Sequence, residues 1–297
     1  MTYSIVARDP TTGEFGVAVQ SHYFSTGSDV PWARPGVGAV ATQATVEVSY
    51  GPRGLELMAA GASAPDALAQ LVARDAHADS RQAAFVDAAG RAAAHTGADA
   101  IPHAGHMTGD GVSCQANIMA STAVWPAMLA AYSRAAGRPL ADRLLDALDA
   151  AEAEGGDLRG RQSAALLVVP GEGDPWEKVV EVRVDDNPEP LVELRRLVGV
   201  QRAYALVEEG DDLLAAGRRT EAADRFDRAE QLAPGNHELS FWSGLSAVQS
   251  GDVDGGLERI RGAIAAQPGW ATLLPMLPAS ISPALALVIE RLGLVGG

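Results

Sequence analysis

Short segments that alternate polar and apolar residues, paired across turn signals, constrain this chain more than any other feature. Residues 2–10 alternate in this way, and residues 15–21 follow after a turn that contains Pro, Thr and Gly. A period of two is typical of strands, and a short turn makes two strands antiparallel neighbours. The pattern recurs at 82–87 with 92–96 and at 162–169 with 178–184. We therefore expect antiparallel sheets.

Helical patterns separate these strand pairs. The predicted helices are 50–60, 64–73, 122–136 and 139–153. Apolar runs at 36–44 and 112–119 predict two further strands, whereas the polar segment 102–111 predicts a loop. Strands that pair as hairpins, with helices kept outside them, indicate an α+β fold.

The last third of the chain is predicted to be a separate helical domain. Residues 185–190 are charged and proline-rich, as at a domain boundary, and they divide the chain into domains at 1–186 and 187–297. Within 203–269, small and apolar residues recur 34 positions apart, a period typical of tetratricopeptide helix pairs. The recurring pairs are Gly210 and Gly244, Ala222 and Gly256, Phe226 and Ile260, Ala229 and Ala263, and Pro234 and Pro268. We expect an all-α, tetratricopeptide-like repeat.

The charge of the chain argues against two classes of partner. The formal net charge is −15 at pH 7, whereas nucleic acids and anionic membranes attract clustered positive charge. Cys114 is the one cysteine, and no charged and apolar leader pattern stands at the start, so we expect a cytoplasmic protein. Residues 270–289 lack charge, but three prolines interrupt them, so we expect them to pack on the preceding helices rather than span a membrane.

Thr2 is the candidate nucleophile. Because a small second residue generally allows Met1 to be removed, we expect Thr2 to carry a free α-amino group. Such an amine titrates at about pH 7.7–8.0 and can serve as the general base for the hydroxyl of the same residue. If the first two strands pair with Val6 opposite Val17, Thr2 lies beside Ser21. The alternative is that Thr2 follows Met1 for no catalytic reason.

Other polar residues have two interpretations each. Gln115 and Asn117 fall on one face of their predicted strand, because the side-chain period is two. Asn117 is either an oxyanion donor or a buried amide satisfied by the backbone. Asp157 and Arg159 either clamp an anionic group of a substrate or form an ion pair that fixes the fold. Cys114 is expected to be a buried core residue rather than a nucleophile.

A stretch that contains three histidines could suggest a metal site. His95, His103, His106 and Asp110 do not match the spacing of closed zinc sites. We interpret them as ordinary loop residues, and we expect no metal and no cofactor.

Several motifs together resemble the bacterial family catalogued as domain of unknown function 1028. They are 4–9, 30–34, 36–44, 50–55, 95–97, 104–106, 115–117 and 156–165. As a set, spread over residues 2–169, they are specific. The resemblance implies an N-terminal-nucleophile hydrolase-like fold, which is a four-layer α/β/β/α sandwich. It implies a reaction only by analogy, because a fold does not fix a function.

The chain departs from the family pattern in two motifs. Tryptophan is usual at the position of His103, and an Asn-Pro dipeptide is usual within 46–49. Proteasome-like members of the wider superfamily also use a lysine beside the nucleophile, whereas Lys178 is the one lysine of this chain. Arg34 could orient groups or stabilise charge in its place, but a guanidinium does not readily give up a proton.

Two functions are compatible with these observations. The first is an amide-bond hydrolase for a small amide or short peptide, in which Thr2 attacks the carbonyl and Asn117 and backbone N–H groups stabilise the oxyanion. Its predicted substrate-binding residues are Ser21, Arg34, Gln43, His106, Gln115, Asp157 and Arg159. The second is a catalytically silent scaffold whose helical repeats dock a peptide or protein partner. Either is compatible with a homo-oligomer.

Overall fold

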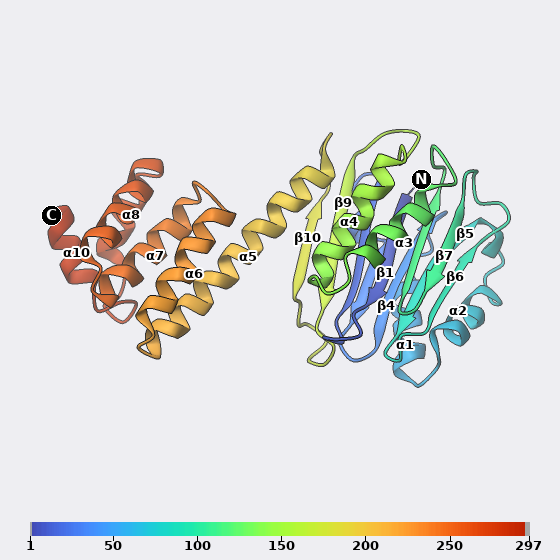
Figure 1. Ribbon diagram of the computed structural model, residues 1–297, viewed down its shortest axis with the longest axis horizontal. Coiled ribbons are helices and arrows are strands. Elements are labelled where there is room, and N and C mark those ends of the chain that lie inside the picture. The colour runs from blue at the N-terminus through green and yellow to red at the C-terminus, as the bar shows by residue number, and fades with distance from the viewer. Residues whose placement is uncertain (1, 295–297) are drawn as a thin grey trace. The chain divides into compact units, whose positions relative to one another are not determined.

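The structure is a computed structural model that describes residues 2–294 (Figure 1). These residues form two antiparallel sheets and ten α-helices, which confirms the α+β class. The chain divides into two compact units, and the division falls between Arg195 and Arg196, inside helix α5 (Pro190–Ala215). The boundary predicted after residue 186 concerns which residues fold independently, and it stays a prediction.

The first sheet has six strands in the order β10-β9-β2-β1-β8-β7. Their bounds are β1 Thr2–Arg8, β2 Phe15–Ser21, β7 Gly105–Gly109, β8 Val112–Asn117, β9 Ser163–Val169 and β10 Val180–Val184. Strand β1 lies between β2 and β8, and Val6 faces Val17 across the first hairpin, as predicted. The start of the chain therefore lies in the middle of a sheet.

The second sheet has four strands in the order β3-β4-β5-β6. They are β3 Pro31–Arg34, β4 Gly38–Ala44, β5 Arg81–Asp87 and β6 Ala92–Thr96. Two strands, β3 and β7, were not predicted, and β7 lies inside the predicted loop 102–111. Strand β7 is a short edge strand, largely exposed and bounded by glycines, so it has no apolar alternation to reveal it.

The two sheets pack face to face through apolar side chains of unequal size. Val6, Val17 and Val19 come from the first sheet, and Ala41 and Ala84 come from the second. All five are fully buried. Small side chains on one sheet leave room for branched side chains on the other, which allows the two sheets to pack closely.

Each sheet carries a pair of helices on its outer face (Figure 1). Helices α3 (Val124–Arg134) and α4 (Leu140–Ala153) contact the six-stranded sheet, and α1 (Tyr50–Ala59) and α2 (Ala64–Val72) contact the four-stranded sheet. Helix α1 can approach closely because it has glycine where it touches the sheet. A Cβ on Gly54 would lie 2.4 Å from the ring of Phe85.

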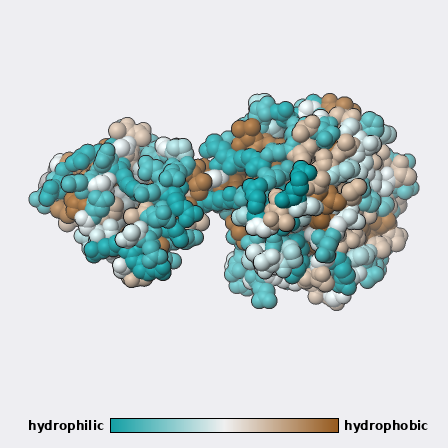
Figure 2. Space-filling model, in the orientation of Figure 1, coloured by the Kyte–Doolittle hydropathy of each residue, from teal (hydrophilic) through white to brown (hydrophobic). Residues whose placement is uncertain are grey.

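The second unit is built from helices. After α5 they are α6 Arg219–Leu232, α7 His237–Ser250, α8 Val253–Ala266, α9 Gly269–Leu273 and α10 Leu285–Leu292. Hydrophilic residues cover most of the face of this unit that is seen in Figure 2, on the left. Phe241 and Ile260 are fully buried in a core that includes Trp270 and Val288, so part of the uncharged segment 270–289 packs on the preceding helices. Within residues 2–294, no helix combines the length and apolarity that crossing a membrane requires.

Two glycines of this unit should respond in opposite ways to alanine. A Cβ on Gly244 would lie 2.7 Å from Ile260 Cγ1 and 2.9 Å from the Gly256 carbonyl, whereas a Cβ on Gly262 would meet nothing within 4 Å. We expect Gly244→Ala to destabilise the unit by about 1–3 kcal/mol through overpacking. Gly262→Ala should stabilise it by roughly 0.5–1 kcal/mol through helix propensity.

Hydrogen exchange of the α7 and α8 amides would measure both effects in the full chain, and Gly262→Ala is the matched control. Equal protection in the two variants would contradict the close helix crossing at Gly244.

A candidate active site at the start of strand β1

Thr2 lies at the start of β1, between two neighbouring strands, with its side chain facing the second sheet. It pairs with Asn117 of β8, and its side chain shares a face with Ser4 and Val6 because alternate residues of a strand point the same way. Thr2 is buried, and its Oγ1 lies 3.1 Å from Oγ of the fully buried Ser21. The predicted proximity of Thr2 and Ser21 is therefore confirmed.

Next to Thr2, a chain of side-chain hydrogen bonds occupies the space between the sheets. Ser4 Oγ donates to Gln43 Oε1 over 2.6 Å, and Gln115 Nε2 donates to Ser4 Oγ over 2.6 Å. Ser113 Oγ then donates to Gln115 Oε1 over 2.8 Å. These four side chains are completely or almost completely buried. The interlayer thus has a polar part at this end, next to the apolar part around Val6.

Gln82 of β5 joins this chain to the second sheet. Its Nε2 lies 2.9 Å from the Ala116 carbonyl and 3.2 Å from the Gly105 carbonyl, which can only accept. The orientation of the amide follows, and Oε1 must point the other way. There it accepts from Gln43 Nε2 at 2.7 Å and from Asn117 Nδ2 at 2.9 Å.

Two amides also hold the backbone of Thr2. Gln43 Nε2 lies 3.3 Å and Asn117 Nδ2 lies 3.5 Å from the Thr2 carbonyl oxygen. The two N–H bonds of Asn117 are thus directed at Thr2 and at Gln82. Of the two interpretations of Asn117, the geometry favours a buried amide that positions its neighbours over a donor that is free for an oxyanion.

The residues that follow these two amides have unusual backbone conformations. Ala44 follows Gln43 with φ of 70°, and Ile118 follows Asn117 with φ of 58°. A positive φ is uncommon for any residue other than glycine and rare for a β-branched one such as Ile118. Each residue held in this conformation lowers the stability of the fold by about 1–3 kcal/mol. Ile118 is held there from both sides, because its N–H donates to Ile101 O and its carbonyl accepts from the Leu158 N–H. Backbone strain of this kind clusters at functional sites.

Tyr3 fixes β1 from the opposite face of the sheet. Its hydroxyl donates to Glu152 Oε1 over 2.5 Å, and Glu152 Oε2 accepts from Arg161 Nε over 2.7 Å. Burial and the nearby Glu152 carboxylate raise the pKa of Tyr3, so the phenol stays protonated. The strand that carries Thr2 is therefore anchored on both faces.

Asp157 and Arg159 lie on a loop at the same end of the sheets. One Asp157 oxygen accepts from the His22 N–H over 3.0 Å, and the other accepts from the Arg159 N–H over 2.9 Å. The Arg159 guanidinium also faces this carboxylate, at 3.2 Å. Because the carboxylate is buried and ties its loop to the end of β2, the geometry favours the interpretation as an ion pair that fixes the fold.

Of the two remaining predicted residues, His106 lies near the network around Thr2 and Arg34 lies far from it. His106 Nδ1 lies 2.8 Å from Thr96 Oγ1, which is 2.9 Å from Gln82 Nε2, so His106 reaches the network through two links. Partial desolvation of the ring and the neighbouring His95 lower the pKa of His106, which favours the neutral imidazole. Arg34, in contrast, pairs with Gly38, five residues along β4 from Gln43 and about 16 Å away. The structure does not bring Arg34 to Thr2.

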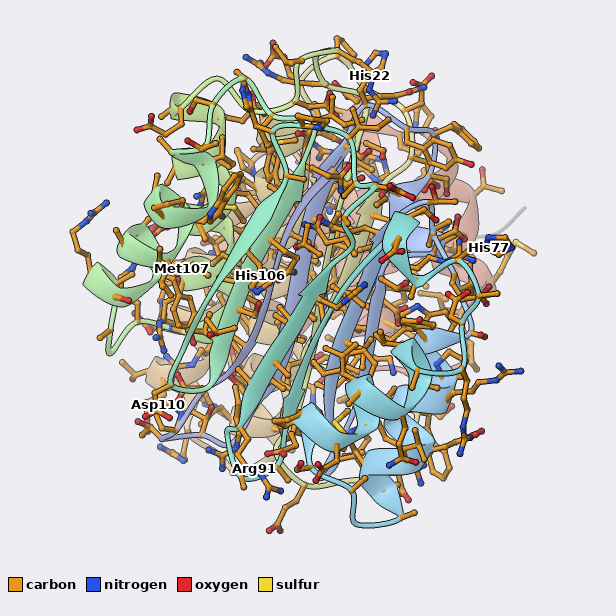
Figure 3. The ribbon with its side chains drawn as sticks, turned by 90° about the vertical axis from the view of Figure 1, so that its right-hand side faces the viewer. His22, His77, Arg91, His106, Met107 and Asp110 are labelled. Carbon is orange, nitrogen blue, oxygen red and sulfur yellow. The ribbon has the colours of Figure 1, made fainter. Side chains whose placement is uncertain are left out.

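His95 and His106 are neighbours, but other histidines lie elsewhere. Figure 3 shows His22, His77 and His106 well apart from one another. Within residues 2–294, no three His, Cys, Asp or Glu side chains are grouped so that they could hold a metal ion. Cys114 is fully buried, and burial raises the pKa of its thiol, which suits a core residue.

Gln82 is the main residue that sequence reasoning missed. The signal was present, because alternation places Gln82 on the same strand face as Ala84 and Val86, and a long amide on an apolar face needs partners. Ser4 and Thr96 were also missed. Both are common residue types in strands, so nothing local distinguishes them.

Replacing Gln82 should destabilise the first unit. Gln82→Leu would leave one N–H bond of Gln43 and one of Asn117 without an acceptor and would remove the side-chain donor to the Ala116 carbonyl, at about 1–3 kcal/mol for each buried group left unpaired. Gln70→Leu, on the exposed face of α2, is the matched control and should stay within about 0.5 kcal/mol. Urea unfolding would compare the two, and equal midpoints would contradict the network.

Comparisons with known proteins agree with the motifs. The model of a family of unknown function, DUF1028, matches residues 2–194. The crystal structure of protein SPO2555 from Silicibacter pomeroyi, described as DUF1028, is similar with a TM-score of 0.60 and 31% sequence identity, over 66% of this chain and 87% of that chain. None of the curated proteins matches. Over residues 2–194, this chain belongs to the DUF1028 family.

Proposed function

We propose that the first unit is an N-terminal-nucleophile hydrolase-like α/β/β/α sandwich that hydrolyses an amide bond, with Thr2 as the nucleophile after removal of Met1. One observation carries the proposal. The Thr2 hydroxyl lies beside Ser21, and the Thr2 carbonyl is held by Gln43 and Asn117, which belong to a buried polar network. A structural threonine at a strand end does not need such support.

The reaction uses both functional groups of one residue. The free α-amine of Thr2 takes the hydroxyl proton as Oγ1 attacks the carbonyl carbon of the substrate. The C–N bond then breaks, the ammonium returns the proton to the leaving amine, and an ester remains on Thr2. Water, deprotonated by the same amine, hydrolyses this ester and regenerates the hydroxyl.

The surrounding residues have positioning roles in this scheme. Ser21 orients the Thr2 hydroxyl, and Gln43 and Asn117 orient the Thr2 peptide. Because both Asn117 N–H bonds are engaged, we assign the stabilisation of the oxyanion to backbone N–H groups. His106, Gln115, Asp157 and Arg159 support the site from further away, and Arg34 has no part in it.

Exposed apolar side chains favour a substrate with an apolar group. Ile101 and Leu158 flank the strained Ile118 through backbone hydrogen bonds, and they are 58% and 61% exposed. Tyr23 and Phe24 follow the end of β2, two and three residues after Ser21, and they are 57% and 62% exposed. Such side chains gain free energy when a ligand covers them. A small amide or short peptide with an apolar substituent suits this end of the unit.

The second unit is proposed to be a tetratricopeptide-like repeat. Two contacts 34 positions apart support this, because Gly210 packs on Phe226 as Gly244 packs on Ile260. Small residues at helix crossings allow the close packing that such repeats need.

Removal of Met1 is the first requirement of the proposed mechanism. We expect the intact mass of the purified protein to be lower than that of the full sequence by one methionine residue. A mass that includes Met1 would exclude the Thr2 amine as the base.

Substitutions of Thr2 test the nucleophile. Thr2→Ser should retain activity, because it keeps the hydroxyl and the amine, whereas Thr2→Ala should lose several orders of magnitude. Stability should change by only about 1 kcal/mol in either variant. Activity of the wild type should fall as the pH drops through the pKa of the amine, because the protonated amine cannot accept the hydroxyl proton.

The assay would compare both variants, with Thr108→Ala on exposed β7 as the control, on N-acyl amino acids, small amides and short peptides. Turnover by Thr2→Ala at the wild-type rate would place the chemistry elsewhere. A wild type with its Thr2 amine free and no turnover on any substrate would favour the catalytically silent scaffold.

A further inference from the structure

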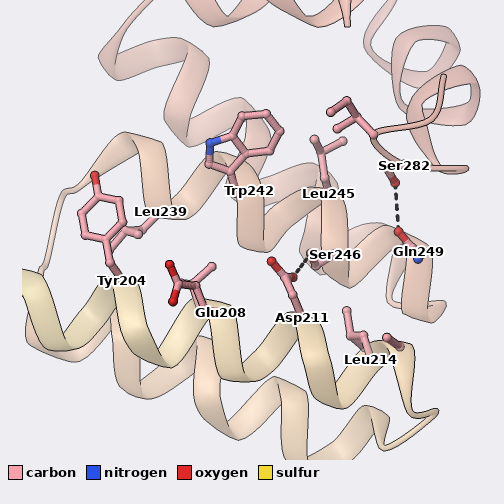
Figure 4. A pocket seen from close by; sticks show the side chains of 13 residues that line it. Tyr204, Glu208, Asp211, Leu214, Leu239, Trp242, Leu245, Ser246, Gln249 and Ser282 are labelled. Carbon is pink, nitrogen blue, oxygen red and sulfur yellow. Dashed lines mark hydrogen bonds between the residues drawn. The ribbon is translucent and has the colours of Figure 1, made fainter. Parts of the chain in front are cut away.

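The second unit contains an open groove between α5 and α7, with a volume of about 450 Å³ (Figure 4). Its α5 wall runs from Tyr204 to Ala215, and its α7 wall runs from Leu239 to Gln249. At a rise of 1.5 Å per residue, each wall is about 15 Å long. An extended peptide covers about 3.3–3.6 Å per residue, so the groove has room for four or five residues.

Apolar side chains line both ends of this groove. Leu239 and Trp242 lie toward one end, and Leu214 lies toward the other. Ile281 also lines the groove, next to Ser282, whose hydroxyl donates to Gln249 at that second end. Trp242 is partly buried, and Ile281 is 50% exposed, so apolar surface is available to a ligand. Covering such surface contributes roughly 25 cal/mol for each Å² removed from water.

Two carboxylates occupy the middle of the groove. Figure 4 shows that Glu208 and Asp211 both point into it from α5. Asp211 accepts a hydrogen bond from Ser246 Oγ over 2.7 Å, and no arginine, lysine or histidine is among the lining residues. Desolvation raises the pKa of Asp211, with smaller contributions from Asp212 and Glu208 of like charge.

A carboxylate on another face of α5 does have a counter-charge. Glu209, the next residue along the helix, is outside the groove and pairs with Arg225 over 2.9 Å. Within the described residues, neither Glu208 nor Asp211 has an ion pair with a cation. A cation placed between them would compensate both charges, and the face of Trp242 also attracts cations.

We propose that this groove binds an extended peptide segment of four or five residues, in which a lysine or arginine side chain lies between Glu208 and Asp211 and apolar side chains pack at both ends. A single small organic cation would fill only the centre and would leave Leu239, Leu214 and Ile281 uncovered. The length of the groove and the separation of its acidic centre from its apolar ends therefore favour a peptide.

The test uses the full chain and capped, fluorescently labelled pentapeptides with leucine or valine at the four outer positions. The central residue is lysine, arginine, norleucine, glutamine or glutamate. We expect the lysine and arginine peptides to bind at least roughly tenfold more tightly than the norleucine peptide, with the glutamate peptide weakest. Added salt should reduce this difference.

Matched variants assign the charge effect to the groove. Glu208→Gln with Asp211→Asn should remove the preference for lysine over norleucine, and Trp242→Ala should weaken all peptides. Glu230→Gln, on an exposed position of α6, removes an equivalent charge outside the groove and should change nothing. Circular dichroism of each variant would confirm that the helices are intact.

Four results would overturn the proposal. The first is equal affinity for the lysine and norleucine peptides, and the second is an unchanged preference in the variant that lacks both carboxylates. The third is binding of lysine amide alone as tightly as the lysine pentapeptide, which would identify a site for a small cation. Failure to bind any of the peptides would also contradict it.

Discussion

The orientation of one buried side-chain amide determines much of the candidate site. Gln82 donates to the Ala116 carbonyl of the first sheet and accepts from Gln43 of its own sheet and Asn117 of the other. If Gln82 lost these partners, burial of its amide would still cost the free energy of desolvation, and no hydrogen bond would offset that cost. Because each partner is itself fixed by a second bond, the network allows one arrangement of the amides, and Thr2 is held by its last members.

Close packing elsewhere between the sheets makes this network possible. The apolar part packs valines of the first sheet against alanines of the second, and these small side chains allow a close approach. Gln43 and Gln82 reach from the second sheet to groups of the first, and Ser4 bridges between Gln43 and Gln115. A looser interior would admit water, and water would compete for the same donors and acceptors.

The sequence predicts the parts of this arrangement that depend on local periodicity. The pairing of Val6 with Val17 follows from alternation, and it places Thr2 beside Ser21 correctly. The order of strands across a sheet and the stacking of two sheets are not local properties. For that reason Arg34 was expected at the site although its strand pairs at the far end of β4, and the central role of Gln82 was not foreseen. The role of Asn117 depends on which acceptors face it, and only the structure gives them.

The network that holds Thr2 consists of amides, hydroxyls and backbone carbonyls, and none of these titrates between pH 2 and 10. Two ionisable side chains near it, Glu152 on Tyr3 and His106 on Thr96, lie outside this set of hydrogen bonds. The network therefore contains no charged group that a change of pH could neutralise or that dissolved salt could screen. These side-chain hydrogen bonds between the sheets should therefore persist in an acidic and in an alkaline buffer, whereas the Tyr3 anchor on the opposite face includes the charged pair of Glu152 and Arg161.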